Sequence, residues 1–574
     1  MLDITEKEVD THCEQQKIVR ILPVSSTGNG PRAWLQRDMS ENIPTYDAVV
    51  IGGGISGMYV TYRLRELGMS FRVFEAGSDV GGTWYWCRYP GARFDSESWS
   101  YGYFFDKELL QEWDWKEHFS PQPDTLEYLN LVADKHDFRR DMVFNARVTA
   151  AEFDDAADHW TVTFEDGSRA RGTLLITCLG VLSAPTLPNI PGRDDFEGQA
   201  FHTARWPHEP VSFEGKRVGV IGTGATAIQA IPEIAKTAEH LTVFQRHPNW
   251  AAPLHNSRIT PGEQKDIKAR YDEIYARCWE TAGCFIHTPD PRSALDATPE
   301  EREAFWEQLY SEPGFGIWIG NYRDILTDER ANALATDFIT RKIRERVNDP
   351  AIAEKLIPKN HGFGLRRLPL ESGYFEAYNR PNVRLVDLNE EPIELITPKG
   401  VRTTVEDHEL DILIYATGFD GVTGGYDSID IRGPGGRRLR DDWKDDLPKT
   451  FFGVLNDGFP NLLMVLGPHT SRGNIPRHIE KVVDFNVGIV RHMRENGYSR
   501  VEARTEEAEK WLAEVIEVNR GRLAGNIPSW QTGVNANVPG RQTIRVLGYY
   551  GGAMRYRELT EKVAAGGYKE LAFR

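Results

Sequence analysis

The stretch YDAVVIGGGISGMYVTYRLRELG, residues 46 to 68, decides the fold of the first part of the chain. An apolar run leads directly into Gly52, Gly54 and Gly57, and an amphipathic helical pattern follows. The next apolar run, FRVFEAG, carries Glu75 near its end. Glycines at this spacing let a diphosphate approach the N–H groups of the helix, and the carboxylate accepts from a ribose hydroxyl. The stretch therefore predicts a dinucleotide-binding βαβ unit.

The same pattern recurs in KRVGVIGTGATAIQAIPEIAK, residues 216 to 236, where Gly222, Gly224 and Ala227 separate a strand pattern from a helix pattern. Here the following strand ends in Arg246 instead of a carboxylate. A carboxylate would repel a 2′-phosphate, whereas a guanidinium pairs with it. The second unit is therefore predicted to bind NADPH and the first FAD, with Arg366 as a second candidate for the phosphate.

These two units organise the whole chain, which we expect to be an α/β protein with two Rossmann-like dinucleotide-binding domains. Residues 1–45 are polar and predict an N-terminal extension. The FAD-binding domain is expected to be discontinuous, over 46–190 and 396–574, because the apolar ELDILIYATGFD (409 to 420) suggests a return to the first domain. The NADPH-binding domain is predicted over 191–395.

The second domain is expected to include a helical insertion from about 255 to 360, where the sequence becomes helical and charged. Within it, Thr298-Pro299-Glu300-Glu301 has the spacing of a helix capping box with proline at the first helical position. We expect this insertion to form a lid or wall over the second nucleotide domain.

Composition excludes several classes of protein. The 574 residues carry a formal net charge of −17 with acidic and basic residues dispersed, which makes nucleic acid an unlikely partner. No apolar run is long enough to cross a bilayer, and the acidic N-terminus lacks the features of a signal peptide, so a cytoplasmic protein is expected. The five cysteines include no CxxC pair, which argues against a metal cluster and a dithiol redox centre.

Two nucleotide domains in this order imply that hydride passes from a nicotinamide to a flavin. A disulfide reductase would need paired cysteines, which the sequence lacks. Oxygen chemistry is therefore the leading hypothesis for the reduced flavin.

Directly upstream of the second glycine motif, the stretch FEGQAFHTARWP (196 to 207) resembles the fingerprint of the Baeyer-Villiger monooxygenases, class B flavoproteins that use FAD and NADPH. Further similarity lies in GGTWYWCRYPGARFDSES (81 to 98), ATGFD (416 to 420) and LRRLPLESGYFEAYNRPNV (365 to 383). The resemblance covers roughly residues 45 to 555.

The resemblance implies that Arg367 is the active-site arginine and that Asp95 is its carboxylate neighbour. In this family, reduced flavin and O₂ form a C4a-peroxide that attacks a ketone, so that one oxygen atom enters beside the carbonyl and an ester or lactone results. A guanidinium can stabilise the negative charge of both the peroxide and the adduct, and a buried carboxylate can orient it. Arg366 stands where the family commonly has lysine.

Other site residues follow from the motifs and the resemblance together. Trp530 resembles a mobile-loop tryptophan that reaches the nicotinamide cofactor or the substrate pocket. The predicted cofactor-binding residues are Gly52, Gly54, Gly57, Glu75, Thr83, Trp84, Asp95, Tyr101, Val148, Gly222, Thr223, Gly224, Ala227, Arg246, Arg366 and Trp530.

The fingerprint residues Phe196, Gly198, His202 and Trp206 suggest a hinge between the two domains. Under this hypothesis Phe196 and Trp206 anchor the segment in apolar pockets, while His202 hydrogen-bonds across the junction.

Two alternatives stay open at the level of sequence. One is a flavin monooxygenase that oxygenates N or S atoms, which would not need Arg367. The other is a nucleotide-sensing flavoprotein without catalysis. The expected partners are a ketone, cyclic or bulky, and O₂; the sequence does not specify which ketone, and the protein is expected to be a monomer or a small homo-oligomer.

Overall fold

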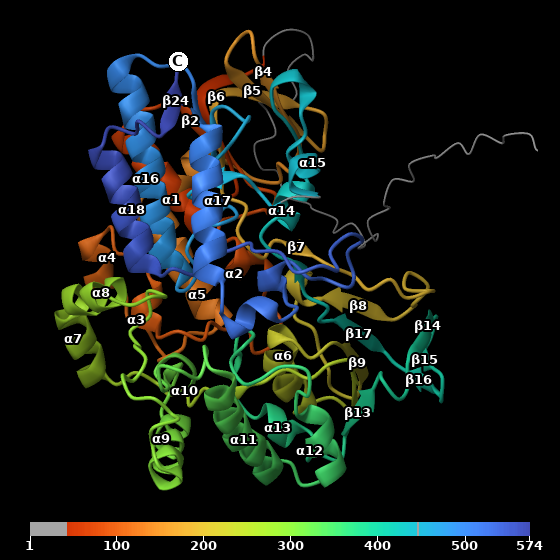
Figure 1. The fold of residues 1–574 in the computed structure, drawn as a ribbon. Coiled ribbons are helices and arrows are strands. Elements are labelled where there is room, and N and C mark those ends of the chain that lie inside the picture. Colours follow the sequence, from red (N-terminus) through yellow and green to blue (C-terminus); the bar gives the residue numbers. More distant parts are fainter. Residues whose placement is uncertain (1–42, 445–446) are drawn as a thin grey trace, which may run out of the picture.

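The computed structural model describes residues 43–444 and 447–574, so that nearly all of the predicted N-terminal extension lies outside the described residues. The described chain forms two large sheets, each with helices packed on it, and smaller two- and three-stranded sheets between and beside them (Figure 1). Among these residues no helix has both the length and the apolar character needed to cross a membrane.

The first large sheet contains the opening glycine motif. Its strand order is β19-β4-β5-β6-β1-β2-β3, with β22 paired to the free part of β6. Strand β1 runs parallel to both β2 and β6, as expected of a βαβ unit, and β4 to β6 form an antiparallel meander. The strands are β1 (Thr45–Ile51), β2 (Phe71–Phe74), β3 (Met142–Val143), β4 (Val148–Asp154), β5 (His159–Phe164), β6 (Arg169–Thr177), β19 (Asp430–Arg432) and β22 (Leu462–Met464).

Helices from both ends of the chain cover this sheet. Helix α1 (Ile55–Glu66) packs beside α16 (Ile475–Asn496), which brings the C-terminal part of the chain onto the first domain (Figure 1). The remaining helices of this domain are α2 (Thr83–Trp86), α3 (Ser98–Tyr101), α4 (Lys107–Glu112), α5 (Gln122–Lys135), α14 (Gly424–Asp427), α15 (Leu439–Lys444), α17 (Thr505–Asn519) and α18 (Ala553–Ala565).

The second large sheet has the order β13-β10-β9-β17-β8, and every pairing in it is parallel. Helix α6 (Ala225–Ala235) follows the second glycine motif and is nearly entirely apolar on its buried face. The strands are β8 (Gln199–His202), β9 (Arg217–Ile221), β10 (His240–Gln245), β13 (Val383–Asp387) and β17 (Ile412–Tyr415).

The sequence predicts that the chain returns to the first domain at residue 396, but the sheet topology places the next strands with the second domain. Strand β17 lies in the second sheet, between β9 and β8, and the meander β14 to β16 packs beside that sheet. The first sheet receives the chain again only at β19. The four residues of β17 are all buried, and such a run fits the centre of either parallel sheet equally well. The meander comprises β14 (Ile393–Thr397), β15 (Gly400–Thr403) and β16 (Asp407–Glu409).

The predicted helical insertion is present between β10 and β13. The capping box at Thr298 is confirmed, since its side chain accepts from Glu301 N and the Glu301 side chain accepts from Thr298 N. The insertion does not cover the second domain alone, because Tyr275 stacks on Phe104 of the first domain with ring centroids 3.9 Å apart. Its helices are α7 (Pro261–Ala269), α8 (Tyr271–Trp279), α9 (Pro299–Ser311), α10 (Gly316–Ile319), α11 (Glu329–Arg346) and α12 (Pro350–Leu356), and α13 (Tyr374–Ala377) follows.

Short strand pairs tie the remaining segments together. The pair β7 (Ala184–Pro185) and β18 (Phe419–Asp420) links the two connections between the domains. The other pairs are β11 (Ala252–Pro253) with β12 (Leu370–Glu371), β20 (Thr450–Phe451) with β21 (Leu455–Asn456), and β23 (Val501–Ala503) with β24 (Leu571–Phe573).

Candidate active site

A cavity of about 1150 Å³ lies between the two domains, and we call it the central cavity. Its wall includes Gly52 and Gly54 of the first glycine motif, Ala225 and Thr226 of the second, and Trp318 of the insertion. The C-terminal segment from 516 to 552 closes a further side. Both predicted nucleotide sites and the insertion therefore meet in one space.

The first glycine motif forms a cradle that only glycine allows. A Cβ on Gly57 would lie 1.9 Å from the carbonyl oxygen of Gly52, and Gly52 itself has a φ of 107° with the Cys178 carbonyl close behind it. The N-terminus of α1 at Gly54 has no side-chain cap, so its N–H groups remain available toward the cavity. This cradle fits the diphosphate of a dinucleotide.

Glu75 is buried and held in place by the backbone. Its Oε2 accepts from Gly53 N and its Oε1 from Gly77 N, both at 2.7 Å. A carboxylate has about four acceptor sites, so Glu75 can still accept from a ribose hydroxyl in the cavity. The predicted ribose contact is therefore geometrically possible.

Predicted flavin-site residues form one wall of the cavity. Trp84 donates its Nε1–H to the Tyr101 hydroxyl at 3.1 Å, and burial raises the pKa of Tyr101 above its usual range. Thr83 lies beside Trp84 on α2, and Val148 begins β4, with its side chain buried. All four of these predicted residues line the same cavity, and Val148 joins the other three from a separate strand.

The second glycine motif also connects a strand to a helix, but fewer of its residues line the cavity. Gly224 is the N-cap of α6, again without a side-chain cap, and Ala227 is fully buried. Thr223 donates its hydroxyl to the His247 carbonyl at 2.8 Å, which holds the turn against β10. Among the described residues of this motif, Ala225 and Thr226 line the cavity, whereas Gly222 and Thr223 do not.

A group of cations lies beside this second motif. Arg246 is exposed at the end of β10, and Arg366 lines the cavity. Burial lowers the pKa of His247, which follows Arg246 in the chain, and the positive charges of Arg246 and Arg366 lower it further. The Nε atom of Arg366 is buried and has no hydrogen-bond partner among the described residues. Such an arrangement suits the 2′-phosphate of NADPH.

Arg367 and Asp95, 272 residues apart in sequence, form an ion pair on the wall of the cavity. Asp95 is 3% exposed, and it also accepts from Gln229 Nε2 and Leu370 N, both at 3.3 Å. Arg367 donates to the Leu368 carbonyl at 2.7 Å, and about a third of its side chain stays accessible. The carboxylate is therefore fixed from three directions, and the guanidinium faces the cavity.

Two further residues contact the Asp95–Arg367 pair, and neither was predicted from the sequence. Gln229 on α6 donates to Asp95 and to the Arg93 carbonyl, and accepts from the Tyr89 hydroxyl at 2.7 Å. Phe315 lies under the guanidinium of Arg367, 5.3 Å from its ring centroid to Cζ. The polar Gln229 within an apolar helix was the only available signal, whereas Phe315 gave none.

Comparisons with known proteins give the family. The model of the flavin-binding monooxygenase-like family matches residues 46–261. A protein of Pseudooceanicola batsensis, a Baeyer-Villiger monooxygenase, is 41% identical over 529 residues, which cover 92% of this chain and 96% of that protein. This chain belongs to the Baeyer-Villiger monooxygenase family.

A further relative and a solved structure show comparable similarity to this chain. The 2-oxo-Δ3-4,5,5-trimethylcyclopentenylacetyl-CoA monooxygenase of Pseudomonas putida is 42% identical over 92% of this chain and 99% of its own length. A crystal structure of OTEMO in complex with FAD and NADP matches with a TM-score of 0.89 and 42% identity, over 93% of this chain and all of that one. The predicted family, fold class and enzyme class are confirmed.

The fingerprint of this Baeyer-Villiger monooxygenase is an edge strand and its cap rather than a free linker. Residues Gln199–His202 form β8 beside β17, and Gly198 lies against the ring of Phe196. Phe196 packs into an apolar cluster of the second domain, whereas the cluster that contains Trp206 also includes first-domain residues such as Cys87. Trp206 thus lies at the junction of the two domains, whereas Phe196 belongs to the second domain.

His202 is buried and caps the turn that follows β8. Its Nδ1 accepts from Ala204 N at 3.0 Å, and its ring lies edge-on to Phe419, with centroids 6.3 Å apart. Burial and, to a lesser extent, the charge of Arg205 lower the pKa of His202 to about 4, although the backbone of Thr186 opposes this shift. The imidazole is therefore neutral at pH 7, and its neighbours Phe419 and Thr186 lie on the two connections between the domains.

Trp530 lies in a turn of the C-terminal segment and lines the central cavity. A Cβ on Gly421 would approach its ring to 2.9 Å, so the indole rests directly on the chain that leaves the second domain. The structure thus places this predicted residue at the junction of the domains.

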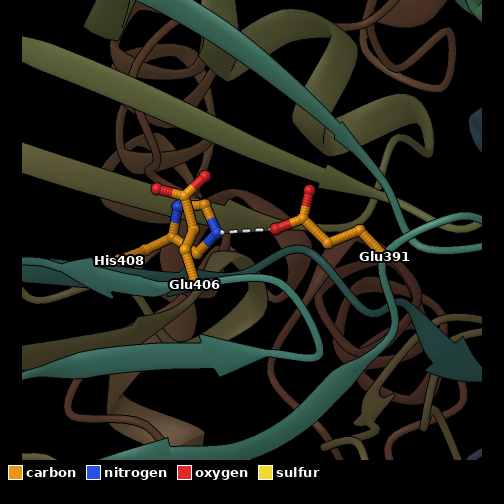
Figure 2. Close-up of side chains that lie close together, drawn as sticks. All are labelled: Glu391, Glu406 and His408. Atoms are coloured by element: carbon orange, nitrogen blue, oxygen red, sulfur yellow. Dashed lines mark hydrogen bonds and ion pairs between the residues drawn. The ribbon is translucent and has the colours of Figure 1, made fainter.

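A separate group of possible metal ligands lies on the small meander, formed by Glu391, Glu406 and His408 (Figure 2). Their ligand atoms lie within 4.8 Å of one another. Glu391 already accepts from Thr403 at 2.6 Å, Glu406 pairs with Arg384, and the His408 ring packs edge-on against Phe244. These partners account for the group as a structural network, and no metal is assigned to it.

Proposed function

We propose that this protein uses FAD and NADPH to insert one oxygen atom of O₂ beside the carbonyl of a ketone, giving an ester or lactone. Membership of the Baeyer-Villiger monooxygenase family supports the reaction, and the Asp95–Arg367 pair in a cavity shared by both glycine motifs supports its location. When bound, FAD takes hydride from NADPH and makes O₂ reactive toward the ketone.

Each cofactor has residues suited to it. The cradle of Gly52, Gly54 and Gly57 would hold the FAD diphosphate, and Glu75 would accept from its ribose. For NADPH, the N-terminus of α6 would hold the diphosphate, and Arg246 with Arg366 would hold the 2′-phosphate.

Arg367 is the proposed catalytic residue. A guanidinium keeps its positive charge throughout the pH range in which proteins are stable, so it stabilises negative charge on a substrate oxygen without supplying a proton. Asp95 orients the guanidinium through its ion pair, and Gln229 and Leu370 N hold Asp95 in turn. Because Gln229 lies on α6, movement of the second domain would be transmitted directly to this pair.

We further propose cyclic or bulky ketones as substrates. The wall of the cavity carries large apolar side chains, among them Phe315 beside Arg367 and, elsewhere on the wall, Trp318 and Trp530, and these can bury a hydrocarbon ring. No polar group other than Arg367 is needed to hold a simple cyclic ketone there.

The proposal is tested by anaerobic flavin reduction followed by aerobic turnover with a panel of ketones from acetone to cyclohexanone and larger rings. We expect NADPH to bleach the flavin faster than NADH, and a cyclic ketone to give a lactone. Consumption of NADPH with only hydrogen peroxide as product, for every ketone, would contradict the proposed reaction.

A further inference from the structure

The wall of the central cavity has a strong excess of positive charge. Its only carboxylates among the described residues are Glu75 and Asp95, which hold the backbone of the first glycine motif and Arg367 respectively. The arginines that line it are Arg93, Arg147, Arg205, Arg323, Arg366, Arg367, Arg472, Arg520, Arg522 and Arg545. Several lie beside the two glycine motifs, where cofactor phosphates are expected, but Arg472 and Arg522 lie on C-terminal segments.

Arg472 is partly buried on the wall of the cavity and forms no ion pair with any described residue. Its Nη2 donates to the Leu547 carbonyl at 2.9 Å, while its Nη1 is buried without a hydrogen-bond partner in the described structure. Burial lowers the pKa of Arg472, and the groups that oppose this effect are tyrosines, not carboxylates. A buried guanidinium with a free donor is costly unless a ligand pairs with it.

Arg522 and Arg472 lie near the same aromatic ring, that of Tyr550. Its Cζ sits 3.9 Å from the ring centroid of Tyr550, and a Cβ on Gly548 would touch both Arg472 and that same ring. Burial lowers the pKa of Arg522, which makes no ion pair with any described residue. The neighbouring Arg520 differs, since it is largely exposed and pairs with Glu517 at 2.9 Å.

A continuous run of contacts connects these two arginines to the catalytic pair. Phe315, under Arg367, packs on Phe285 with centroids 5.2 Å apart. Phe285 lies against Gly283, and the Gly283 carbonyl accepts from Asn474 N. The same carbonyl would lie 2.0 Å from a Cβ on Gly473, the residue that follows Arg472. The apolar rings of Phe315 and Phe285 thus lie between Arg367 and the segment that carries Arg472.

We propose that Arg472 and Arg522 bind an anionic group, such as a carboxylate, on the far side of the ketone substrate. The two guanidinium groups would hold the anion while the apolar wall of Phe285 and Phe315 contacts the hydrocarbon between it and the carbonyl. The inference rests on the proposed ketone monooxygenase function and assigns the substrate class as oxo acids. Arg472 and Arg522 are then specificity residues, since they act on binding and not on oxygen insertion.

The test compares 3-(2-oxocyclohexyl)propanoate with its neutral methyl ester as substrates of the FAD-loaded enzyme. We expect a lower KM for the acid than for the ester. In Arg472→Gln and in Arg522→Gln the KM for the acid should rise about tenfold or more, the usual size of a lost charged hydrogen bond, while kcat and the KM for the ester stay within about twofold. The matched control is Arg520→Gln, which removes the same charge from an arginine that has its own carboxylate.

Three results would overturn the proposal. Equal KM values for acid and ester in the parent enzyme would remove the anion site. An equal rise in Arg520→Gln would indicate a diffuse field instead of a site, and a rise in the KM for NADPH or a loss of FAD would assign the two arginines to a cofactor. If neither ketone is oxygenated although NADPH reduces the flavin, the proposed function itself fails. Because Arg472 bonds to Leu547 and its variant can lose stability, Arg522→Gln carries the test independently.

Discussion

Replacing Arg367 by alanine separates the proposed role of this residue in catalysis from its role in stability. The variant removes the one cation that pairs with Asp95 among the described residues, and the carboxylate keeps two donors, Gln229 Nε2 and Leu370 N, both at 3.3 Å. Loss of one partner of a buried ion pair costs about 3–5 kcal/mol, and we expect roughly 1–3 kcal/mol because about a third of Arg367 is accessible. The rate of ketone oxidation should fall about 100- to 1000-fold, the usual effect of removing a group that stabilises developing negative charge.

The assay combines anaerobic stopped-flow reduction by NADPH with aerobic product formation and urea unfolding. Reduction should stay within a few-fold of the parent enzyme, because the predicted NADPH phosphate site at Arg246 and Arg366 is intact. The double variant Asp95→Asn/Arg367→Ala should regain much of the lost stability, since no unpaired carboxylate remains, without regaining activity. If Arg367→Ala oxidised ketones within tenfold of the parent rate, or if the double variant restored activity, the assigned role would be wrong.

Three other perturbations follow from the geometry. Arg246→Gln and Arg366→Gln should each raise the KM for NADPH about tenfold and leave the KM for NADH unchanged. The control is Arg341→Gln, at an exposed position. An equal rise in the KM for NADH would exclude phosphate recognition. Gly57→Ala should abolish FAD retention, measured by flavin absorbance, because its Cβ would lie 1.9 Å from Gly52 O. The control Gly262→Ala should retain FAD, since open space surrounds that position. A Gly57→Ala variant fully loaded with FAD would refute the cradle. Because the pKa of His202 falls to about 4 on folding, its neutral form stabilises the fold above the unfolded value of 6.5, and this stability is lost as pH falls from 6.5 toward 4. His202→Gln should therefore reduce the stability difference between pH 7.5 and 5.5 by about 1 kcal/mol in urea unfolding, and an unchanged difference would contradict a buried neutral imidazole.

Local sequence patterns predicted the parts of the fold that local physics determines. The turns at Gly52 and Gly222 require glycine because a carbonyl lies directly behind each, so the glycine spacing predicts both turns from the sequence. The capping box at Thr298 likewise depends on residues three positions apart. Such features need no knowledge of the rest of the chain.

Long-range pairing was accessible only through resemblance or not at all. Asp95 and Arg367 are separated by 272 residues, and no periodicity in the sequence joins them. The sequence alone does not assign β17 to the second sheet, because a short, fully buried run fits the centre of either sheet. Gln229, Phe315, Arg472 and Arg522 acquire their significance from the segments that fold against them.

The origin of the inserted oxygen atom tests the central claim most directly. The FAD-loaded enzyme would be supplied with NADPH, cyclohexanone and ¹⁸O₂, and the product analysed by mass spectrometry. Our account predicts a lactone that carries one ¹⁸O atom, located in the ring, with one NADPH consumed for each lactone formed. An unlabelled lactone, or oxidation of NADPH with hydrogen peroxide as the sole product, would contradict it.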